Sequence, residues 1–267
     1  MTRMEFFDTH CHFDFEDFAV DREELWRTCR EQGIRYMLIP VVQPEQWPRM
    51  RDHCRPDNGI YFAAGLHPCW LHGNVDRQNL QQQLPQLQED LSKFAQTPGC
   101  IAIGECGLDQ FIDGDEVLQE TVLSAHLEVA QTCDKPIILH CRRAHNAMLR
   151  ILKNHPLTRG GILHAYSGSL EQAEQYWKMG FYLGIGGTIT YERANKTRMA
   201  VKELPLASLV LETDAPDMPL NGHQGKRNTP LQIREVARTL AELRNESMEL
   251  IAQQTTANAK KLFHLAH

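Results

Sequence analysis

The chain has 267 residues, of which 42% are hydrophobic, and its 28 basic and 34 acidic side chains give a formal net charge of −6. This length and apolar content allow a large core, and one domain over residues 1–267 is expected. The acidic balance excludes a wide electrostatic surface for nucleic acid, so any polyanion must be held locally, by metal ions and a few cations.

No apolar stretch has the length of a membrane span, and residues 1–5 lack the pattern of a signal peptide. The eight cysteines form no Cys-x-x-Cys pair, which favours reduced thiols. We therefore expect a cytoplasmic protein, and a monomer is the expected state because no apolar face is left over. Three cysteines directly follow a candidate ligand and are expected to pack in the core, namely Cys11, Cys106 and Cys141.

The first predicted strand begins with Phe6 and Phe7 and leads into His10, Cys11 and His12. Because side chains alternate along a strand, the two histidines project from one side, and a metal ion can take a nitrogen from each. Taken alone the pair is weak evidence, since a histidine at a strand end is more often a hydrogen-bonded scaffold residue.

Strand-like and helix-like segments then alternate to the end of the chain. Further strands are predicted at 35–40, 61–66, 100–103, 136–139, 161–163, 181–185 and 208–211. Helices are predicted at 22–32, 46–54, 80–95, 117–133, 144–154, 170–179, 195–204, 230–243 and 248–263. The strands are continuous apolar runs, as in parallel sheets covered on both faces. This pattern predicts an α/β fold, a (β/α)8 TIM barrel, with a doubly wound open sheet as the alternative.

Six potential metal ligands share one kind of position, at or just after the end of a predicted strand. They are His10, His12, Glu105, His140, His164 and Asp214. In a barrel these ends open onto one rim, where the active sites of the fold lie. Six ligands are too many for one tetrahedral ion and suit two divalent ions that share a bridging carboxylate. Each residue alone has an ordinary structural explanation, but their joint placement predicts a metal site.

Several ordered motifs resemble the TatD family of metal-dependent hydrolases and DNases, which belong to the amidohydrolase-like barrel superfamily. The motifs are His10-Cys11-His12, residues 65–68, residues 104–109, the strand-end histidines, residues 212–216 and residues 227–230. Residues 166–173, 186–191 and 214–222 look most like the YjjV branch of that family. Cys106 stands where isoleucine is more usual and Thr229 where glutamate is frequent, and both departures bear on substrate preference rather than on metal binding.

The resemblance implies a role for each ligand. His10, His12 and Asp214 would hold one divalent ion, Glu105 would bridge, and His140 and His164 would hold the second. Asp214 would act as general base beside Glu105 at the catalytic centre. The ions expected from this ligand set are Zn²⁺, Mn²⁺, Mg²⁺ or Ni²⁺. His67 would contact a substrate phosphate, with a buried structural histidine before Pro68 as the alternative.

Other charged residues are expected around the same rim. Asp109 and Glu212 are predicted to orient ligands or to serve as scaffold charges. Some of the cations near strand ends should line the rim, and the candidates are Arg142, Arg143, Arg193, Lys196, Arg198, Lys226 and Arg227. If two or three converge there, they provide the local grip on anions that an acidic protein otherwise lacks.

The leading hypothesis from the sequence is a divalent-metal-dependent deoxyribonuclease. A hydrolase of a small phosphoester, amide or lactone on the same dinuclear site is the first alternative, because the site activates water whatever bond is presented. A non-catalytic, metal-binding interaction module is the second alternative. No obligate protein partner and no membrane association are expected.

Overall fold

A computed structural model of the chain describes residues 4–71, 77–112 and 116–265. Eight parallel strands form one sheet in which each strand pairs with its neighbours in the sequence, in the order β1 to β8. The backbone N–H of Thr9, just after β1, donates to the carbonyl of Leu211 in β8 over 3.0 Å, which joins the first and last strands. The predicted TIM barrel is therefore confirmed, and the doubly wound alternative, whose strand order reverses, is wrong.

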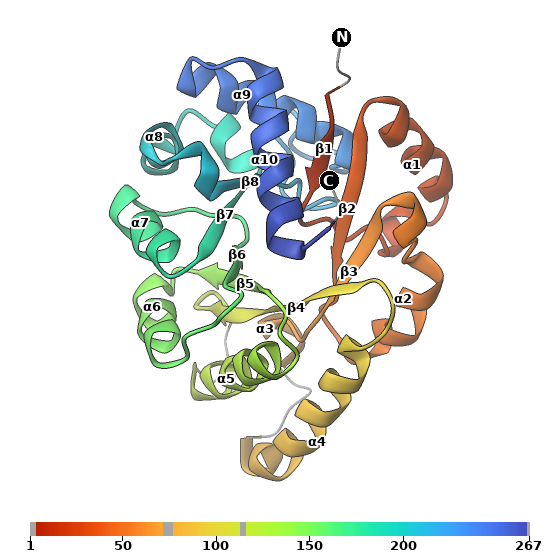
Figure 1. The fold of residues 1–267 in the computed structure, drawn as a ribbon, viewed down its shortest axis with the longest axis vertical. Helices are drawn as coiled ribbons and strands as arrows, with labels where there is room; N and C mark the ends of the chain where they lie inside the picture. The colour runs from red at the N-terminus through yellow and green to blue at the C-terminus, as the bar shows by residue number, and fades with distance from the viewer. Residues whose placement is uncertain (1–3, 72–76, 113–115, 266–267) are drawn as a thin grey trace.

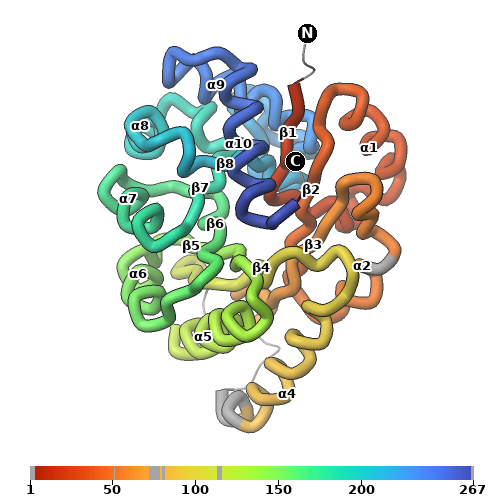
Figure 2. The backbone as a smooth tube through the Cα atoms, viewed as in Figure 1, coloured from red at the N-terminus to blue at the C-terminus, as the bar shows by residue number. Residues whose placement is uncertain are grey.

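The strands are β1 Phe6–Asp8, β2 Ile34–Pro40, β3 Ile60–Ala64, β4 Cys100–Asp109, β5 Ile137–Arg142, β6 Gly161–Leu163, β7 Phe181–Ile185 and β8 Leu209–Leu211. The α-helices are α1 Arg22–Glu31, α2 Trp47–His53, α3 Pro68–Leu71, α4 Arg77–Ala95, α5 Glu116–Thr132, α6 His145–Asn154, α7 Leu170–Lys178, α8 Asn195–Glu203, α9 Ile233–Arg244 and α10 Met248–Phe263. Short 3₁₀ turns connect them. Figure 2 shows the chain winding once around the barrel in sequence order, from red to blue.

Several predicted boundaries differ from the structure, and the largest differences concern β4 and β3. The strand predicted at 100–103 continues to Asp109, because β4 pairs with β5 beyond a register shift between Ile103 and Cys106. The strand predicted at 61–66 ends at Ala64, and a short helix, α3, follows that the sequence patterns had not indicated. Period-two and period-3.6 patterns say little about such short or irregular pieces.

The inside of the barrel is filled by one apolar residue from each strand. These residues are Phe7, Leu38, Ala63, Ala102, Ile138, Ile162, Tyr182 and Val210, and they form one cluster with Ala259, Leu262 and Phe263 of α10. In Figure 1, α10 lies in front of the strands and covers this end of the barrel. Polar side chains that follow the inner layer along each strand therefore lie toward the other end, at the carboxyl ends of the strands.

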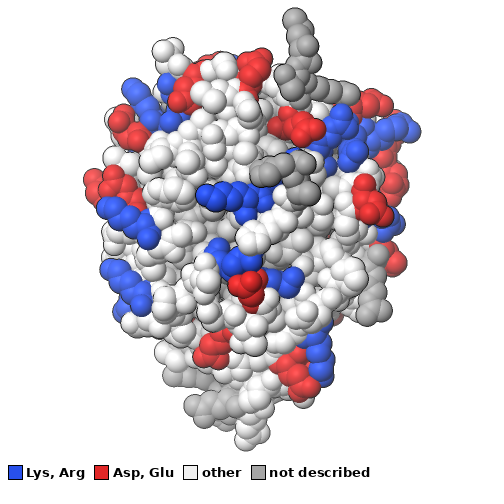
Figure 3. Space-filling model, viewed as in Figure 1, with Lys and Arg blue, Asp and Glu red and all other residues white. Residues whose placement is uncertain are grey.

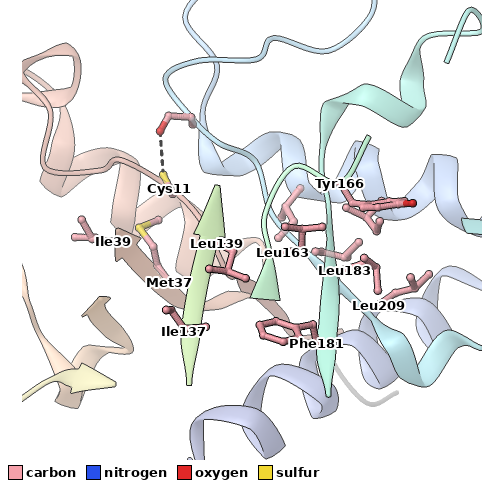
Figure 4. Close-up of a cluster of buried hydrophobic side chains, with 14 of the residues drawn as sticks. Cys11, Met37, Ile39, Ile137, Leu139, Leu163, Tyr166, Phe181, Leu183 and Leu209 are labelled. Carbon is pink, nitrogen blue, oxygen red and sulfur yellow. Dashed lines mark hydrogen bonds between the residues drawn. The ribbon is translucent and has the colours of Figure 1, made fainter. Parts of the chain in front are cut away.

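A second core lies between the strands and the helices. Neighbouring residues such as Ile137 and Leu139 of β5 belong to this outer core, whereas Ile138 belongs to the inner layer. Figure 4 shows Leu139, Leu163, Leu183 and Leu209 side by side in it. Cys11 and Cys106 are buried in this core, and Cys141 packs against it, which confirms the prediction for the three cysteines.

Charged side chains of both signs are mixed over the face that carries α10 (Figure 3). No continuous basic surface appears there, in agreement with the net charge of −6. Among the described residues, every helix is too short or too polar to cross a membrane.

Candidate metal centre

The predicted ligands come from five strands of the barrel. His10 and His12 follow β1, His164 follows β6, and Asp214 lies three residues after β8. Glu105 and His140 lie inside β4 and β5, because both strands continue past the predicted ends. Alternation along β5 puts His140 on the side of Ile138, the inner layer, and the same rule puts His164 on the side of Ile162.

The ends of β1 and β8 are tied together by Asp8, a residue that the sequence analysis did not assign. The Asp8 carboxylate accepts hydrogen bonds from the Thr213 hydroxyl at 2.6 Å and from the Thr213 backbone N–H at 3.0 Å. The backbone N–H of Asp214 donates to the carbonyl of His10 over 2.9 Å. These bonds hold His10 beside Asp214. The only sequence signal for Asp8 was its place two residues before His10.

Glu105 lies at the centre of the site and is 1% exposed. Its Oε2 is 3.0 Å from Nε2 of His10 and 3.9 Å from Nε2 of His12. Its Oε1 is 3.1 Å from Nδ1 of His140 and 3.5 Å from Nε2 of His164. One carboxylate therefore faces two separate pairs of imidazoles, one with each oxygen.

Asp214 faces the first pair only. Its Oδ1 is 3.6 Å from Nε2 of His10 and 3.4 Å from Nε2 of His12. The Asp214 backbone is left-handed, with φ at 56°, a conformation that aspartate tolerates better than most residues. The six predicted residues thus converge on one site, with Asp214 on the side of His10 and His12.

Several nitrogens of the buried histidines lack a hydrogen-bond partner, as expected for ligands of a cation. Neither ring nitrogen of His10 has a hydrogen-bond partner among the described residues, and Nδ1 of His12 has none either. Nε2 of His10 lies 3.0 Å from a carboxylate oxygen without hydrogen-bond geometry. A buried polar atom without a partner is costly, and a divalent ion coordinated by imidazole and carboxylate removes that cost.

Three groups have ligand atoms within 4.8 Å of one another: His10 with His12 and Glu105, His10 with His164 and Glu212, and His67 with Glu105 and His140.

The site holds its carboxylates ionised. Burial alone raises the pKa of Glu105, but the nearby His10, His164 and His67 outweigh it and bring that pKa well below its usual range. Burial also opposes ionisation of Asp214, and His164 with the hydrogen bond from His12 lowers its pKa in the same way. Burial and the neighbouring His164 lower the pKa of His10. Ionised carboxylates beside a neutral imidazole are the protonation states that a divalent ion needs.

Glu212 and Asp109 orient two of the histidines, as the sequence suggested for them. Oε1 of Glu212 lies 3.1 Å from Nδ1 of His164 and accepts the backbone N–H of Ala165 at 2.7 Å. A carboxylate can only accept here, so Nδ1 of His164 carries a proton and donates it to Glu212, which leaves Nε2 as the nitrogen that faces Glu105. Oδ2 of Asp109 lies 3.0 Å from Nε2 of His140, which leaves Nδ1 of that ring facing Glu105.

Gly184 of β7 provides the room that Glu212 occupies. A Cβ atom at this position would lie 2.1 Å from Oε2 of Glu212. Any larger residue therefore displaces the carboxylate that orients His164. No sequence pattern marked this glycine.

His67 lies at the edge of the cluster and is neutral. Its Nδ1 accepts the backbone N–H of Cys69 at 3.0 Å, so the ring of a neutral His67 carries its proton on Nε2. Burial, opposed only in part by Glu105, lowers the pKa of His67 to about 3. Nε2 lies 3.5 Å from Oε1 of Glu105. His67 is thus a neutral hydrogen-bond donor at the edge of the cluster.

A cavity of about 470 Å³ opens over the cluster. Its lining comprises His12, Phe15, Val42, Gln43, His67, Cys69, Trp70, Glu105, Asp109, His140, Arg142, His164, Asp214 and Asp217. Of the seven cations that the sequence placed near strand ends, Arg142 alone is in this lining. Arg227 instead forms an ion pair with Asp21, and Arg198 donates to the carbonyl of Ile189.

Comparison with known proteins decides the family. The family model described as TatD related DNase matches residues 7–264. The chain belongs to the TatD family. The expectation from the sequence motifs is thereby confirmed.

Relatives of this TatD chain are described as metal-dependent hydrolases. The chain is 42% identical to the uncharacterized metal-dependent hydrolase YjjV of Escherichia coli K12, covering 97% of this chain and 98% of YjjV. It is 33% identical to the uncharacterized metal-dependent hydrolase YabD of Bacillus subtilis 168, covering 97% and 99%. The crystal structure of E. coli YjjV, a TatD homologue, superposes with a TM-score of 0.88 and covers 98% of both chains. The chain is accordingly a metal-dependent hydrolase of the TatD family.

A more distant structure shows how far the fold extends. A TatD family hydrolase from Entamoeba histolytica is 16% identical, covers 100% of both chains and has a TM-score of 0.83. At this identity the likeness concerns the fold alone.

Proposed function

We propose that this TatD protein is a divalent-metal-dependent deoxyribonuclease that hydrolyses phosphodiester bonds. The observation that supports the proposal best is the Glu105 carboxylate, which faces His10 and His12 with one oxygen and His140 and His164 with the other. A shared carboxylate between two ligand sets is typical of dinuclear sites that act on phosphate esters. The family description, TatD related DNase, supports DNA as the substrate.

In this proposal the residues divide into two ligand sets. His10, His12 and Asp214 hold one ion, His140 and His164 hold the other, and Glu105 contributes an oxygen to each. The orientation of the rings supports this division, because Glu212 takes Nδ1 of His164 and Asp109 takes Nε2 of His140, so that the other nitrogen of each ring faces Glu105. When bound, the ions supply Lewis-acid activation of water and of the phosphoryl group.

Asp214 is the proposed general base. Its carboxylate is ionised, since the nearby histidines lower its pKa, and it lines the cavity. It can therefore take the proton from the attacking water while Glu105 remains ionised and holds its place in the cluster. His67 is proposed as the group that donates its Nε2–H to a substrate phosphoryl oxygen, because Nδ1 is already occupied by Cys69.

A small phosphoester is the second candidate substrate. The cavity of about 470 Å³ has the size of a small-molecule site. Four of its lining residues are carboxylates and only Arg142 among the described lining is a lysine or arginine, which favours a compact substrate held mainly by ions.

The experiment that tests the proposal compares substrates and variants on one preparation. Purified protein is incubated with labelled single-stranded DNA and, separately, with bis(p-nitrophenyl) phosphate, each with Mg²⁺, Mn²⁺, Zn²⁺ or Ni²⁺. We expect metal-dependent cleavage of DNA that is lost in His10→Ala and Asp214→Asn. Asp57→Asn, an exposed aspartate in a 3₁₀ turn before β3, is the matched control and should keep full activity.

Each result that differs from this expectation points to a different conclusion. Cleavage of the small ester without cleavage of DNA selects the second candidate. DNA cleavage that survives Asp214→Asn removes the proposed base. Tight metal binding with no turnover of DNA, phosphoesters or amides would instead support the non-catalytic, metal-binding interaction module.

A further inference from the structure

An exposed aromatic side chain with two arginines against it lies beside the metal centre. Phe111 is 48% exposed. The guanidinium carbon of Arg142 is 3.9 Å from the centre of its ring, and that of Arg143 is 4.1 Å away. We call these three residues the Phe111 cluster. Cation–π contact with an aromatic face restricts a guanidinium group while leaving the N–H groups on its edge free.

The Phe111 cluster is built on the two strands that carry Glu105 and His140. Arg142 is the last residue of β5 and pairs with Asp109, the last residue of β4. The turn that leads to Phe111 is fixed by two hydrogen bonds, from the Gln110 N–H to the Arg142 carbonyl at 3.1 Å and from the Phe111 N–H to Oδ1 of Asp109 at 2.7 Å. The other oxygen of Asp109 faces His140. One carboxylate thus connects a candidate ligand to the turn of the cluster.

The two arginines have no ion-pair partner within the described ranges. Neither guanidinium group makes a hydrogen bond or salt bridge to any residue in 4–71, 77–112 or 116–265. Arg227 shows the contrast, since both its terminal nitrogens bond the carboxylate of Asp21. Two neighbouring guanidinium groups without an ion-pair partner among the described residues attract an anion even in a protein of net charge −6, and their planar N–H edges match the oxygens of a phosphate.

The position of the arginines indicates the length of the ligand. Arg142 lines the cavity over the metal centre, whereas Arg143 does not. A small phosphoester bound in the cavity reaches Arg142 at most. A ligand that contacts both arginines extends from the cavity onto the surface and carries negative charge along its length.

We propose that the Phe111 cluster binds the sugar–phosphate backbone of a single nucleic-acid strand next to the bond that is cleaved. This inference rests on the proposed nuclease function and adds the group that distinguishes a strand from a small ester. Arg142 and Arg143 contact phosphates that are not cleaved. Phe111 is a positioning residue, because it keeps the two guanidinium groups in place.

The test measures strand binding by the metal-loaded protein. A labelled single-stranded oligonucleotide with phosphorothioate linkages, which slow cleavage, is titrated at several salt concentrations and followed by fluorescence anisotropy. Each phosphate contact on a single strand contributes about 0.7 to the slope of log K against log salt. The double variant Arg142→Gln/Arg143→Gln should therefore lower the slope by about 1.4 and weaken binding about 25-fold at about 0.1 M salt.

The matched control removes the same charge elsewhere. Arg27 on α1 and Arg150 on α6 have side chains that are 68% and 58% exposed, and neither lines the cavity. Arg27→Gln/Arg150→Gln should bind the strand with nearly the wild-type slope. Arg143 lies outside the cavity, so hydrolysis of bis(p-nitrophenyl) phosphate should stay within about two-fold of wild type in Arg143→Gln, as in Arg27→Gln/Arg150→Gln. Arg143→Gln should still lower the salt slope of strand binding by about 0.7.

Variants of Phe111 separate positioning from folding. Phe111→Leu removes the aromatic face and should weaken strand binding, while Phe111→Tyr keeps the face and should restore it. Thermal unfolding of all variants shows whether the fold is intact.

The outcomes separate this inference from the proposed function. If wild-type protein cleaves DNA and Arg142→Gln/Arg143→Gln binds the strand like wild type, the inference is wrong and the nuclease stands. A loss of small-ester hydrolysis in Arg143→Gln as large as its loss of strand binding also overturns the inference, because Arg143 then acts inside the cavity. If the wild type cleaves only the small ester, the proposed nuclease function fails before any variant is considered.

Discussion

Glu212 offers the sharpest test of how the metal centre is built. The side chain is fully buried, and its Oε1 contacts both Nδ1 of His164 and the backbone N–H of Ala165. Burial lowers the pKa of His164, but Glu212, Glu105 and Asp214 together raise it to about 10. The carboxylate of Glu212 is the largest of these raising influences. It therefore makes the His164 ring a stronger base and a better ligand.

Two substitutions divide this contribution. Glu212→Gln keeps the shape of the side chain and an oxygen that can accept both hydrogen bonds, so it removes mainly the negative charge. We expect this variant to bind one ion about ten-fold more weakly, a loss of about 1.4 kcal/mol. Glu212→Ala also removes both hydrogen bonds and leaves the His164 ring without its orienting partner. Here we expect about 100-fold weaker binding, the upper end for groups that orient a ligand.

Metal titration is the measurement for both variants. Zn²⁺ or Mn²⁺ is added to metal-free protein in competition with a chromogenic chelator, and elemental analysis gives the number of ions retained. Glu235→Gln is the control, because this glutamate pairs with Arg238 on the surface of α9. If both Glu212 variants bind two ions as tightly as wild type, the argument from the His164 proton is wrong, and His164 is a structural residue.

Three further predictions concern other parts of the molecule. Burial lowers the pKa of His126 from 6.5 to about 4, so the unfolded chain binds the proton more readily than the folded chain. The free energy of unfolding should therefore fall by about 3 kcal/mol as the pH drops from 6.5 to 4. Urea unfolding of His126→Gln should show a smaller fall over the same pH range. Gly184→Ala should lower the melting temperature and weaken metal binding, because its Cβ would meet Glu212; unchanged calorimetry and metal content would contradict this. Treatment with EDTA should lower the melting temperature, and Mn²⁺ or Zn²⁺ should restore it, because the buried histidines then regain a partner; identical scans would argue against a resident ion.

Much of the fold and of the candidate site could be predicted because both follow from alternation along strands. Ile138 and His140 lie on one side of β5, and Ile162 and His164 continue in the same way from β6, so an apolar inner layer followed by a histidine places that histidine at the mouth of the barrel. The order of the strands then brings residues 10 and 214 together, since β1 and β8 meet when the barrel closes.

The remaining features depend on contacts that alternation does not encode. Glu105 lies beyond a register shift in β4, so counting residues from Ile103 does not give its direction. Asp8 matters because of Thr213, more than 200 residues away. No sequence pattern marked Phe111, and the pairing of Asp109 with Arg142 is what brings it against two arginines.

The charges at the centre link substrate binding to metal binding. The cavity lining holds Glu105, Asp109, Asp214 and Asp217 beside a neutral His67 and beside His164, whose pKa is raised to about 10. Without metal ions these carboxylates offset the cationic groups of the lining, in which Arg142 is the only lysine or arginine described. Bound metal ions should therefore raise the affinity for a phosphate substrate, and the metal-free protein should bind it weakly, mainly through the arginines at the rim. An acidic protein can act on a polyanion in this way, because the attraction is confined to the place where the bond is broken.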